Sequence, residues 1–290
     1  MTGILLIPLV VLAWASAFVG VRAIAQDLSP GAIACGRYLV AAVVLAVVAA
    51  VARPPRPRPG ELPRLALMGL LGIGIYNLAF NAGMRTVPAG TTAFVVNGLI
   101  VLGTTVAGAW WLREAVPRRR WFALALAMGG LAAIAVGKDG RLGGVGIPWL
   151  VLCALSGIAY NIVQKGLLPR FGAIGCTCWA VWLGLLPLLG WLPDLVAALP
   201  DAPGRVPTAL VFLGVVPGAL AYLLWAMVLS RMTASRAGLS LAAIPVAVVV
   251  LAWLVLGEWP APLSLAGGAV ILAAVVWNLW PVAIRTGDAR

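Results

Sequence analysis

The sequence Gly31-Ala32-Ile33-Ala34-Cys35-Gly36-Arg37-Tyr38 returns later in the chain as Gly172-Ala173-Ile174-Gly175-Cys176-Thr177-Cys178-Trp179. Other pairs of residues repeat at a similar separation, which predicts that the chain is a doubled unit. We place the first copy at residues 1–140 and the second at residues 141–290. The further pairs are Phe18 with Tyr160, Arg22 with Gln164, Gly72 with Gly218, Tyr76 with Tyr222, Arg85 with Arg231, and Glu114 with Glu258.

The doubling has a consequence for topology, since each copy holds about five apolar spans. An odd number of spans forces the second copy to enter the membrane in the opposite sense from the first. Inverted repeats of this kind are typical of secondary transporters, whose substrate sites lie at the repeat interface near the middle of the bilayer.

The composition supports a membrane location for all of these spans. Of the 290 residues 63% are hydrophobic and 10% are charged, whereas about 25% of the residues of a soluble domain are charged. The net charge of +12 does not indicate nucleic-acid binding, because the arginines cluster at the ends of apolar runs. That placement is typical of a membrane protein that follows the positive-inside rule.

A helix needs about 20 apolar residues to cross the hydrocarbon core, and backbone groups in lipid must be paired within a helix or a barrel. We therefore predict an all-α integral membrane protein with ten transmembrane helices, arranged as two inverted five-helix repeats. The expected spans are 4–24, 31–51, 65–84, 89–111, 121–138, 145–165, 173–192, 208–229, 236–256 and 262–284.

The loops between these spans differ in charge. With the N-terminus inside, the inner loops and the C-terminal tail hold fourteen lysines and arginines, against five in the outer loops. This bias predicts that both termini are cytoplasmic. Only two of the basic residues are lysines, as in GC-rich bacterial genomes, so we expect a bacterial inner-membrane protein. The first span lacks a basic n-region and is expected to be a retained helix.

Several local patterns resemble one known family. Trp14-Ala15-Ser16-Ala17-Phe18 is similar to its opening motif, and Pro30 followed by Arg37 is similar to its second-span motif. Pro245 followed by Leu256-Gly257-Glu258 is similar to its proline-to-acidic helix end. Together with the repeat, these patterns resemble the drug/metabolite transporter superfamily, specifically the ten-helix exporters built from two EamA-type domains. The resemblance implies transport of amino acids, nucleotide sugars or drugs, and the layout looks most like bacterial amino-acid exporters, including the aromatic type.

The first copy departs from this pattern, because Val101 stands where the second copy has Pro245. We therefore expect the fourth helix to be straighter than the ninth. Pro217, Gly218 and Pro245 are candidate hinges for alternating access, with tight helix packing as the alternative.

Polar and aromatic residues inside the spans are the candidates for a substrate cavity, because polar groups are expensive in lipid. Asn77, Phe80 and Asn81 share a helix face by their spacing. Hydrogen bonding between helices is the alternative role for the asparagines. The candidate cavity residues are Trp14, Ser16, Phe18, Tyr76, Asn77, Phe80, Asn81, Phe94, Asn97, Tyr160, Asn161, Gln164, Tyr222 and Trp225.

Charged and reactive groups are scarce inside the spans. Arg37 lies about two turns inside the second span, where snorkelling, pairing with carbonyls and anion binding all stay open. No aspartate or glutamate falls in the middle of a span, and the chain has no histidine. We therefore expect no enzyme, no catalytic residue, no metal and no cofactor. A zwitterion could be held by hydroxyls, amides, aromatic faces and helix-end dipoles.

The sequence thus predicts a secondary transporter that exports small metabolites, most of all amino acids, by alternating access. An exporter of drugs or other metabolites is one alternative, and a channel-like facilitator, which would need a ring of charges or carbonyls, is the other. The expected partners are a small-molecule substrate and the lipid bilayer. A monomer is expected because one chain supplies the whole pathway, with a dimer as the alternative.

Overall fold

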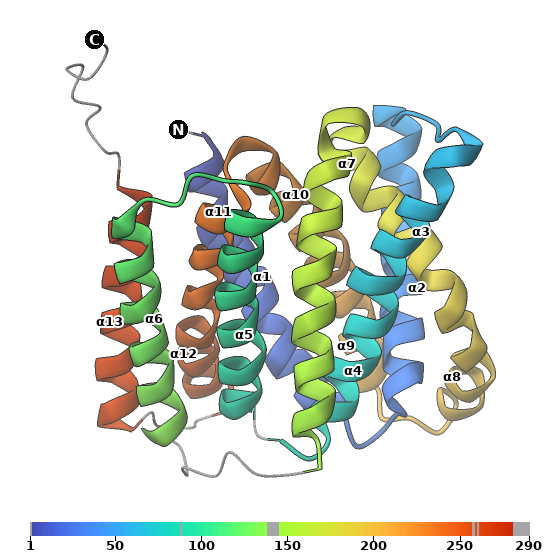
Figure 1. The fold of residues 1–290 in the computed structure, drawn as a ribbon. Coiled ribbons are helices and arrows are strands. Elements are labelled where there is room, and N and C mark those ends of the chain that lie inside the picture. The colour runs from blue at the N-terminus through green and yellow to red at the C-terminus, as the bar shows by residue number, and fades with distance from the viewer. Residues whose placement is uncertain (1, 88, 138–144, 257–258, 260, 281–290) are drawn as a thin grey trace.

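The structure is a computed structural model that describes every residue except 1, 88, 138–144, 257–258, 260 and 281–290. All regular elements in the described part are helical (Figure 1). The long helices are α1 (Thr2–Ile24), α2 (Pro30–Ala52), α5 (Ala89–Trp110), α6 (Arg118–Gly137), α7 (Ile147–Leu188) and α13 (Pro262–Leu279). The shorter ones are α3 (Leu62–Gly69), α4 (Tyr76–Met84), α8 (Leu192–Ala198), α9 (Arg205–Leu213), α10 (Ala221–Arg231), α11 (Ala234–Ser240) and α12 (Ile244–Leu256).

Eight stretches of described residues are long and apolar enough to cross a membrane, which confirms an all-helical, multi-pass membrane protein. One stretch, Ile147–Ala198, has 52 residues, far more than the roughly 20 that span the hydrocarbon core. Inside it Gly172 has φ 65° and ψ 179° and interrupts the helix of α7. Glycine adopts a positive φ without a steric penalty, and the chain reverses its direction near this point (Figure 1).

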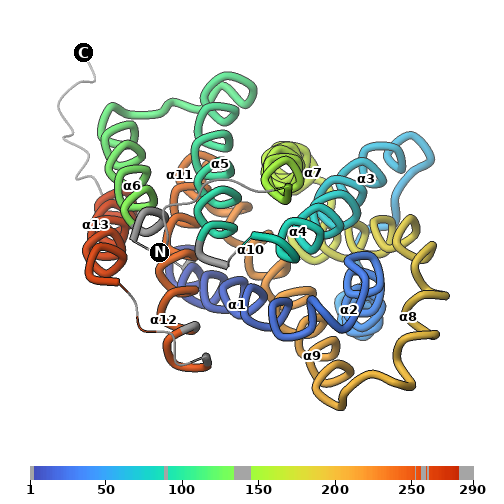
Figure 2. Tube along the Cα trace, turned by 90° about the horizontal axis from the view of Figure 1, so that it is seen from below, coloured from blue at the N-terminus to red at the C-terminus, as the bar shows by residue number. Residues whose placement is uncertain are grey.

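The long helix α6 is not among these eight stretches. It has 20 residues and lies beside α13 at one edge of the molecule (Figures 1 and 2). Their backbones approach closely, because a Cβ added to Gly130 would lie 2.6 Å from the carbonyl oxygen of Gly267. A similar approach joins α3 to α7, where a Cβ on Gly69 would lie 2.6 Å from the backbone nitrogen of Gly184. Small residues at such crossings let membrane helices pack by backbone contact.

Two π-helical segments interrupt the helices that line the centre of the molecule. The first, η2 (Leu70–Ile75), joins α3 to α4, and the second, η4 (Gly214–Leu220), joins α9 to α10. They contain Gly72 and Gly218, which the sequence pairs as repeat equivalents. Pro217 lies within η4, where its missing N–H removes one helical hydrogen bond. Segments of this type are frequent at functional sites.

The predicted hinge residues occupy two different settings. Pro217 and Gly218 lie in η4, whereas Pro245 is the second residue of α12, directly after the 3-10 turn η5 (Leu241–Ala243). The ninth predicted span is thereby divided into α11, η5 and α12, while α5 is continuous from Ala89 to Trp110. The fourth predicted helix is therefore straighter than the ninth, as expected because Val101 stands where the second copy has a proline.

Candidate substrate cavity

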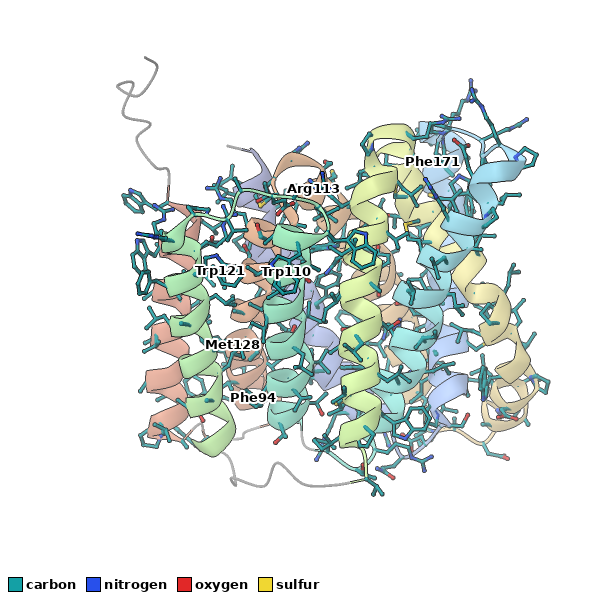
Figure 3. The ribbon with its side chains drawn as sticks, viewed as in Figure 1. Phe94, Trp110, Arg113, Trp121, Met128 and Phe171 are labelled. Atoms are coloured by element: carbon teal, nitrogen blue, oxygen red, sulfur yellow. The ribbon has the colours of Figure 1, made fainter. Side chains whose placement is uncertain are left out.

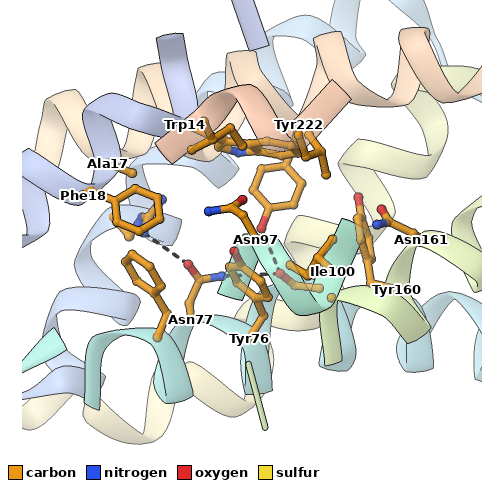
Figure 4. Close-up of a pocket in the computed structure, with 16 residues that line it drawn as sticks. Trp14, Ala17, Phe18, Tyr76, Asn77, Asn97, Ile100, Tyr160, Asn161 and Tyr222 are labelled. Carbon is orange, nitrogen blue, oxygen red and sulfur yellow. Dashed lines mark hydrogen bonds between the residues drawn. The ribbon is translucent and has the colours of Figure 1, made fainter. Parts of the chain in front are cut away.

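The centre of the molecule holds a cavity to which elements from both ends of the chain contribute (Figure 4). Its empty volume, which includes open solvent, is about 670 Å³. The lining residues are Trp14, Ala17, Phe18, Arg37, Gly72, Tyr76, Asn77, Phe80, Asn97, Ile100, Gly157, Tyr160, Asn161, Tyr222, Leu241 and Ile244.

Aromatic rings form one continuous part of this wall. The ring of Trp14 lies 5.5 Å from that of Tyr222, edge to face, and 5.6 Å from that of Trp225, which does not itself line the cavity. Tyr222 also meets Tyr160, with their ring centroids 5.9 Å apart. Edge-to-face pairs at such separations are favourable, because the positive ring edge meets the negative ring face. The arrangement joins α1, α7 and α10 around one side of the cavity.

Tyrosine hydroxyls connect the π segment η2 and helix α2 to α10 across the cavity. The hydroxyl of Tyr222 donates to the carbonyl oxygen of Gly72 at 2.9 Å (Figure 4). The hydroxyl of Tyr38 in α2 in turn donates to the hydroxyl of Tyr222 at 3.3 Å. Gly72 lies within η2, so this π segment supplies the acceptor that holds Tyr222.

The amides at the cavity also bind within the protein. Asn77 donates through Nδ2 to the carbonyl of Ile73 at 3.0 Å and to that of Gly72 at 3.4 Å. Asn161 accepts from the indole Nε1 of Trp225 at 2.9 Å. Both asparagines thus line the cavity and form hydrogen bonds within or between helices. The Nδ2 of Asn97 donates to Ala93 within α5.

Arg37 is the one charged residue in the wall of this cavity. Its side chain is 3% exposed, and Nη1 donates to Oδ1 of Asn77 at 3.1 Å. The guanidinium carbon lies 5.2 Å from the ring centroid of Tyr38, within the range of a cation–π contact. The sequence singled out Arg37 by its depth in the second predicted span, but it left the role of the side chain open.

Nine of the predicted cavity residues line the cavity and five do not. Ser16 donates to the carbonyl of Ala13 at 2.8 Å, and Asn81 donates to that of Pro30 at 3.0 Å, so both hold backbone instead. Phe94 lies on α5 below the level of Trp110 (Figure 3) and is partly buried. Gln164 and Trp225 stand behind the wall. Gln164 donates to the hydroxyl of Tyr160 at 2.7 Å, and Trp225 donates to Oδ1 of Asn161 at 2.9 Å.

Small and aliphatic residues complete the wall, and sequence reasoning missed them because they carry no polar signal. Gly72 is the clearest case, since an added Cβ would overlap the ring of Tyr160. At Gly157 an added Cβ would lie 3.1 Å from the ring of Tyr76. The glycines therefore make room for the two tyrosine rings. The other small or aliphatic lining residues outside the predicted set are Ala17, Ile100, Leu241 and Ile244.

No carboxylate is among the residues that line the cavity, and the described carboxylates that make contacts lie at helix ends. Glu114, after α5, accepts from the backbone nitrogens of Ala234 and Ser235 at the start of α11, at 2.6 and 3.0 Å. Asp27 pairs with Arg205 at 2.8 Å. Glu61 pairs with Arg170 at 3.1 Å. Among the described residues no group of three His, Cys, Asp or Glu side chains could hold a metal ion.

A multi-pass helical protein with a polar and aromatic cavity at its centre has the architecture of a small-molecule transporter. The sequence pattern of the EamA-like transporter family matches residues 1–136 and 144–280, and the chain belongs to this family. The resemblance to the drug/metabolite transporter superfamily is thereby confirmed. The protein is a transporter and not an enzyme.

Relatives extend this similarity over most of the chain. A "Probable terminal-alkyne amino-acid exporter" of Streptantibioticus cattleyicolor is 33% identical, covering 92% of this chain and 90% of its own. The "Uncharacterized transporter YdfC" of Bacillus subtilis is 30% identical, covering 91% and 87%. A "Probable amino-acid metabolite efflux pump" of Salmonella typhimurium is 26% identical, covering 96% and 94%. One crystal structure has the same fold, with a TM-score of 0.75 over 96% of both chains at 16% identity.

Proposed function

We propose that this protein exports small metabolites, amino acids foremost, across the bacterial inner membrane by alternating access. The observation that carries the proposal is a central cavity lined by aromatic rings, amides and one guanidinium, without a carboxylate. Such a lining suits a zwitterion better than a multiply charged cation, which would need a buried anion. The printed names of two relatives, an amino-acid exporter and an amino-acid metabolite efflux pump, support the same substrate class.

The proposed topology has ten crossings in two inverted repeats. Eight stretches qualify directly, and the reversal at Gly172 divides Ile147–Ala198 into two passes. α6 supplies the tenth. The boundary proposed at residues 140 and 141 lies outside the described residues. The π segments η2 and η4 at repeat-equivalent positions support the duplication.

The proposed orientation follows from charge. α1 begins and α13 ends at the same face of the molecule, the upper one in Figure 1. Most described basic residues fall in or near connections at that face, and far fewer at the opposite one, which supports a cytoplasmic location for both termini. The upper residues are Arg53, Arg56, Arg58, Arg64, Arg113, Arg118, Arg119, Arg120, Lys165, Arg170, Arg231 and Arg236, and the lower ones are Arg22, Arg85 and Arg205.

We further propose that the working unit is one chain, because the residues of a single chain enclose the cavity. The moving parts would be the helices interrupted at Pro217 and Gly218, with Pro245 at the start of α12. A dimer would leave this pathway unchanged, and light scattering of the detergent-solubilised protein would distinguish the two states.

The test is counterflow in liposomes that contain only the purified protein. Vesicles loaded with one unlabelled amino acid are diluted into a trace of the same labelled amino acid, and we expect a transient accumulation of label above equilibrium. Accumulation with drugs or other metabolites, but with no amino acid, would move the assignment to another substrate class. Equilibration without overshoot for permeant solutes would indicate a channel and refute the carrier proposal. Empty liposomes and vesicles containing a Trp14→Ala variant serve as controls.

A further inference from the structure

Arg37 stands out among the buried groups because its hydrogen-bonding capacity is almost unused. A guanidinium has five N–H donors and no acceptor. Within the described part of the chain, Arg37 makes one hydrogen bond, from Nη1 to Asn77 Oδ1, and its buried Nε has no partner. The described ion pairs join other residues, Arg170 with Glu61 and Arg205 with Asp27. A charge inside a membrane protein is costly without an anion, and such residues are usually functional.

Other arginines with an unpaired Nε differ in position and partners. Arg120 binds the hydroxyl of Ser235, and Arg236 binds the carbonyl of Leu279 at 2.6 Å. Both begin or border helices at the end of the molecule where α6 starts and α13 finishes. Arg37, by contrast, lies well inside α2 and in the cavity wall. Its uncompensated charge therefore faces the space that a ligand would occupy.

The surroundings hold the guanidinium in one place. Asn77 uses its Nδ2 on the carbonyls of Ile73 and Gly72, so its Oδ1 is left to accept from Arg37. The backbone of Arg37 is packed tightly too, because a Cβ added to Gly214 would lie 2.5 Å from its carbonyl oxygen. A charged group positioned before the ligand arrives loses little conformational entropy on binding.

We propose that Arg37 binds the carboxylate of the transported molecule in this cavity, with Asn77 as the residue that positions the guanidinium. A carboxylate matches the planar fork of a guanidinium and can accept two parallel hydrogen bonds from it. The cavity would then select molecules with a free carboxylate and discriminate against the corresponding amines. The inference rests on the proposed function, since it names the chemical group by which the same cavity recognises an amino acid.

The rest of the cavity fits the remainder of such a molecule. An ammonium group would meet the aromatic faces of Trp14 and Tyr222 and the amide of Asn97, whose Nδ2 is already held by Ala93. Cations are attracted to aromatic faces. The substrate side chain would lie against Phe18 and Phe80, whose rings meet edge to face at 5.0 Å.

The test measures binding directly, so that it does not depend on transport. Isothermal titration calorimetry of the purified protein compares three ligands on one skeleton: L-phenylalanine, 3-phenylpropionate and phenethylamine. The same comparison is made with L-methionine, 4-(methylthio)butanoate and 3-(methylthio)propylamine. We expect the carboxylates of at least one skeleton to bind on the order of 100-fold more tightly than the amine, and Arg37→Gln to lose this preference. Arg205→Gln, which removes a charge outside the cavity, should retain it.

A second variant separates ligand binding from a structural role. Asn77→Asp places a carboxylate at the position that now accepts from Arg37 Nη1 at 3.1 Å. This internal anion should raise the thermal stability of the ligand-free protein and weaken carboxylate binding on the order of 100-fold. It also keeps the test available if Arg37→Gln does not fold.

Three outcomes would overturn the inference: no carboxylate binding by the wild-type protein, equal binding of amines and carboxylates, or undiminished carboxylate binding by Asn77→Asp. Carboxylate binding that depends on Arg37, combined with failure of amino-acid counterflow, would instead refute the proposed function and leave the inference standing. The two failures are therefore distinguishable.

Discussion

The contact between Glu114 and the start of α11 makes a sharp prediction about opening of the molecule. The carboxylate accepts from Ala234 N at 2.6 Å, from Ser235 N at 3.0 Å and from the Ser235 hydroxyl at 2.7 Å. It thus joins the connection after α5 to α11, at the face proposed to be cytoplasmic. We expect this contact to break when that face opens in the proposed transport cycle.

The cost of breaking it can be worked from these bonds. Hydrogen bonds to a charged acceptor contribute about 1.5–3 kcal/mol each, and an anion at a helix N-terminus adds about 0.3–1 kcal/mol. Glu114→Gln keeps one acceptor oxygen and turns an NH₂ group toward the remaining donors. Since the carboxylate is only half-buried, we discount the sum to a loss of about 2–3 kcal/mol, which shifts a two-state equilibrium by about 30- to 150-fold.

The assay uses a reporter at the contact itself. Ala234 is fully buried, and the four native cysteines are free and buried, so the background labelling by a hydrophilic maleimide should be low. In an Ala234→Cys background we expect Glu114→Gln to raise the labelling rate at least tenfold, as the closed state becomes less populated. Glu61→Gln is the matched control, because it breaks the surface pair with Arg170, which is worth only about 0–1 kcal/mol. Equal labelling rates in the two variants would refute the reasoning.

Three further predictions concern packing around and beyond the cavity. Gly72→Ala should drive the ring of Tyr160 into the cavity and raise the KM for counterflow while the protein stays folded, and an unchanged KM would contradict this. Trp225→Phe keeps an aromatic ring but loses the indole donor and part of a fully buried side chain, so thermal unfolding should show a loss of at least about 1 kcal/mol, whereas an unchanged Tm would contradict a stabilising role for this side chain. Gly130→Leu should destabilise the α6–α13 contact strongly and Gly129→Leu should not, because nothing lies within 4 Å of a Cβ at Gly129; similar melting temperatures for the pair would count against backbone packing there.

The sequence was sufficient for the helical, multi-pass fold because apolar length and charge at helix ends are local properties. Gly72 and Gly218, which the sequence pairs as repeat equivalents, both lie in π-helical segments, but the pairing itself did not predict that geometry. The division of the ninth predicted span could be anticipated from Pro245, since proline acts on its own helix turn. These features require no knowledge of which helices are neighbours.

The composition of the cavity was only partly predictable, since depth in the membrane does not define the direction of a side chain. Ser16 and Asn81 have the polarity and depth of cavity residues, but they bind backbone carbonyls. Gly157 and Ile244 line the cavity, although nothing in their chemistry marks them. Glu114 was identified from the sequence only as a repeat partner. Its role as a cap on α11 depends on a contact between residues 120 positions apart.

The carbonyl of Gly72 connects Arg37, the proposed carboxylate-binding residue, to Tyr222 in the second half of the chain. Gly72 O accepts both from Asn77 Nδ2 at 3.4 Å and from the Tyr222 hydroxyl at 2.9 Å. Asn77 holds Arg37, whereas Tyr222 belongs to α10 and joins η2 to the second half of the chain. A carboxylate bound by Arg37 would change the charge beside Asn77, the donor that competes with Tyr222 for this oxygen. Because a ligand shifts a conformational equilibrium only through contacts that differ between the states, this shared acceptor offers a direct physical route from substrate binding to helix movement.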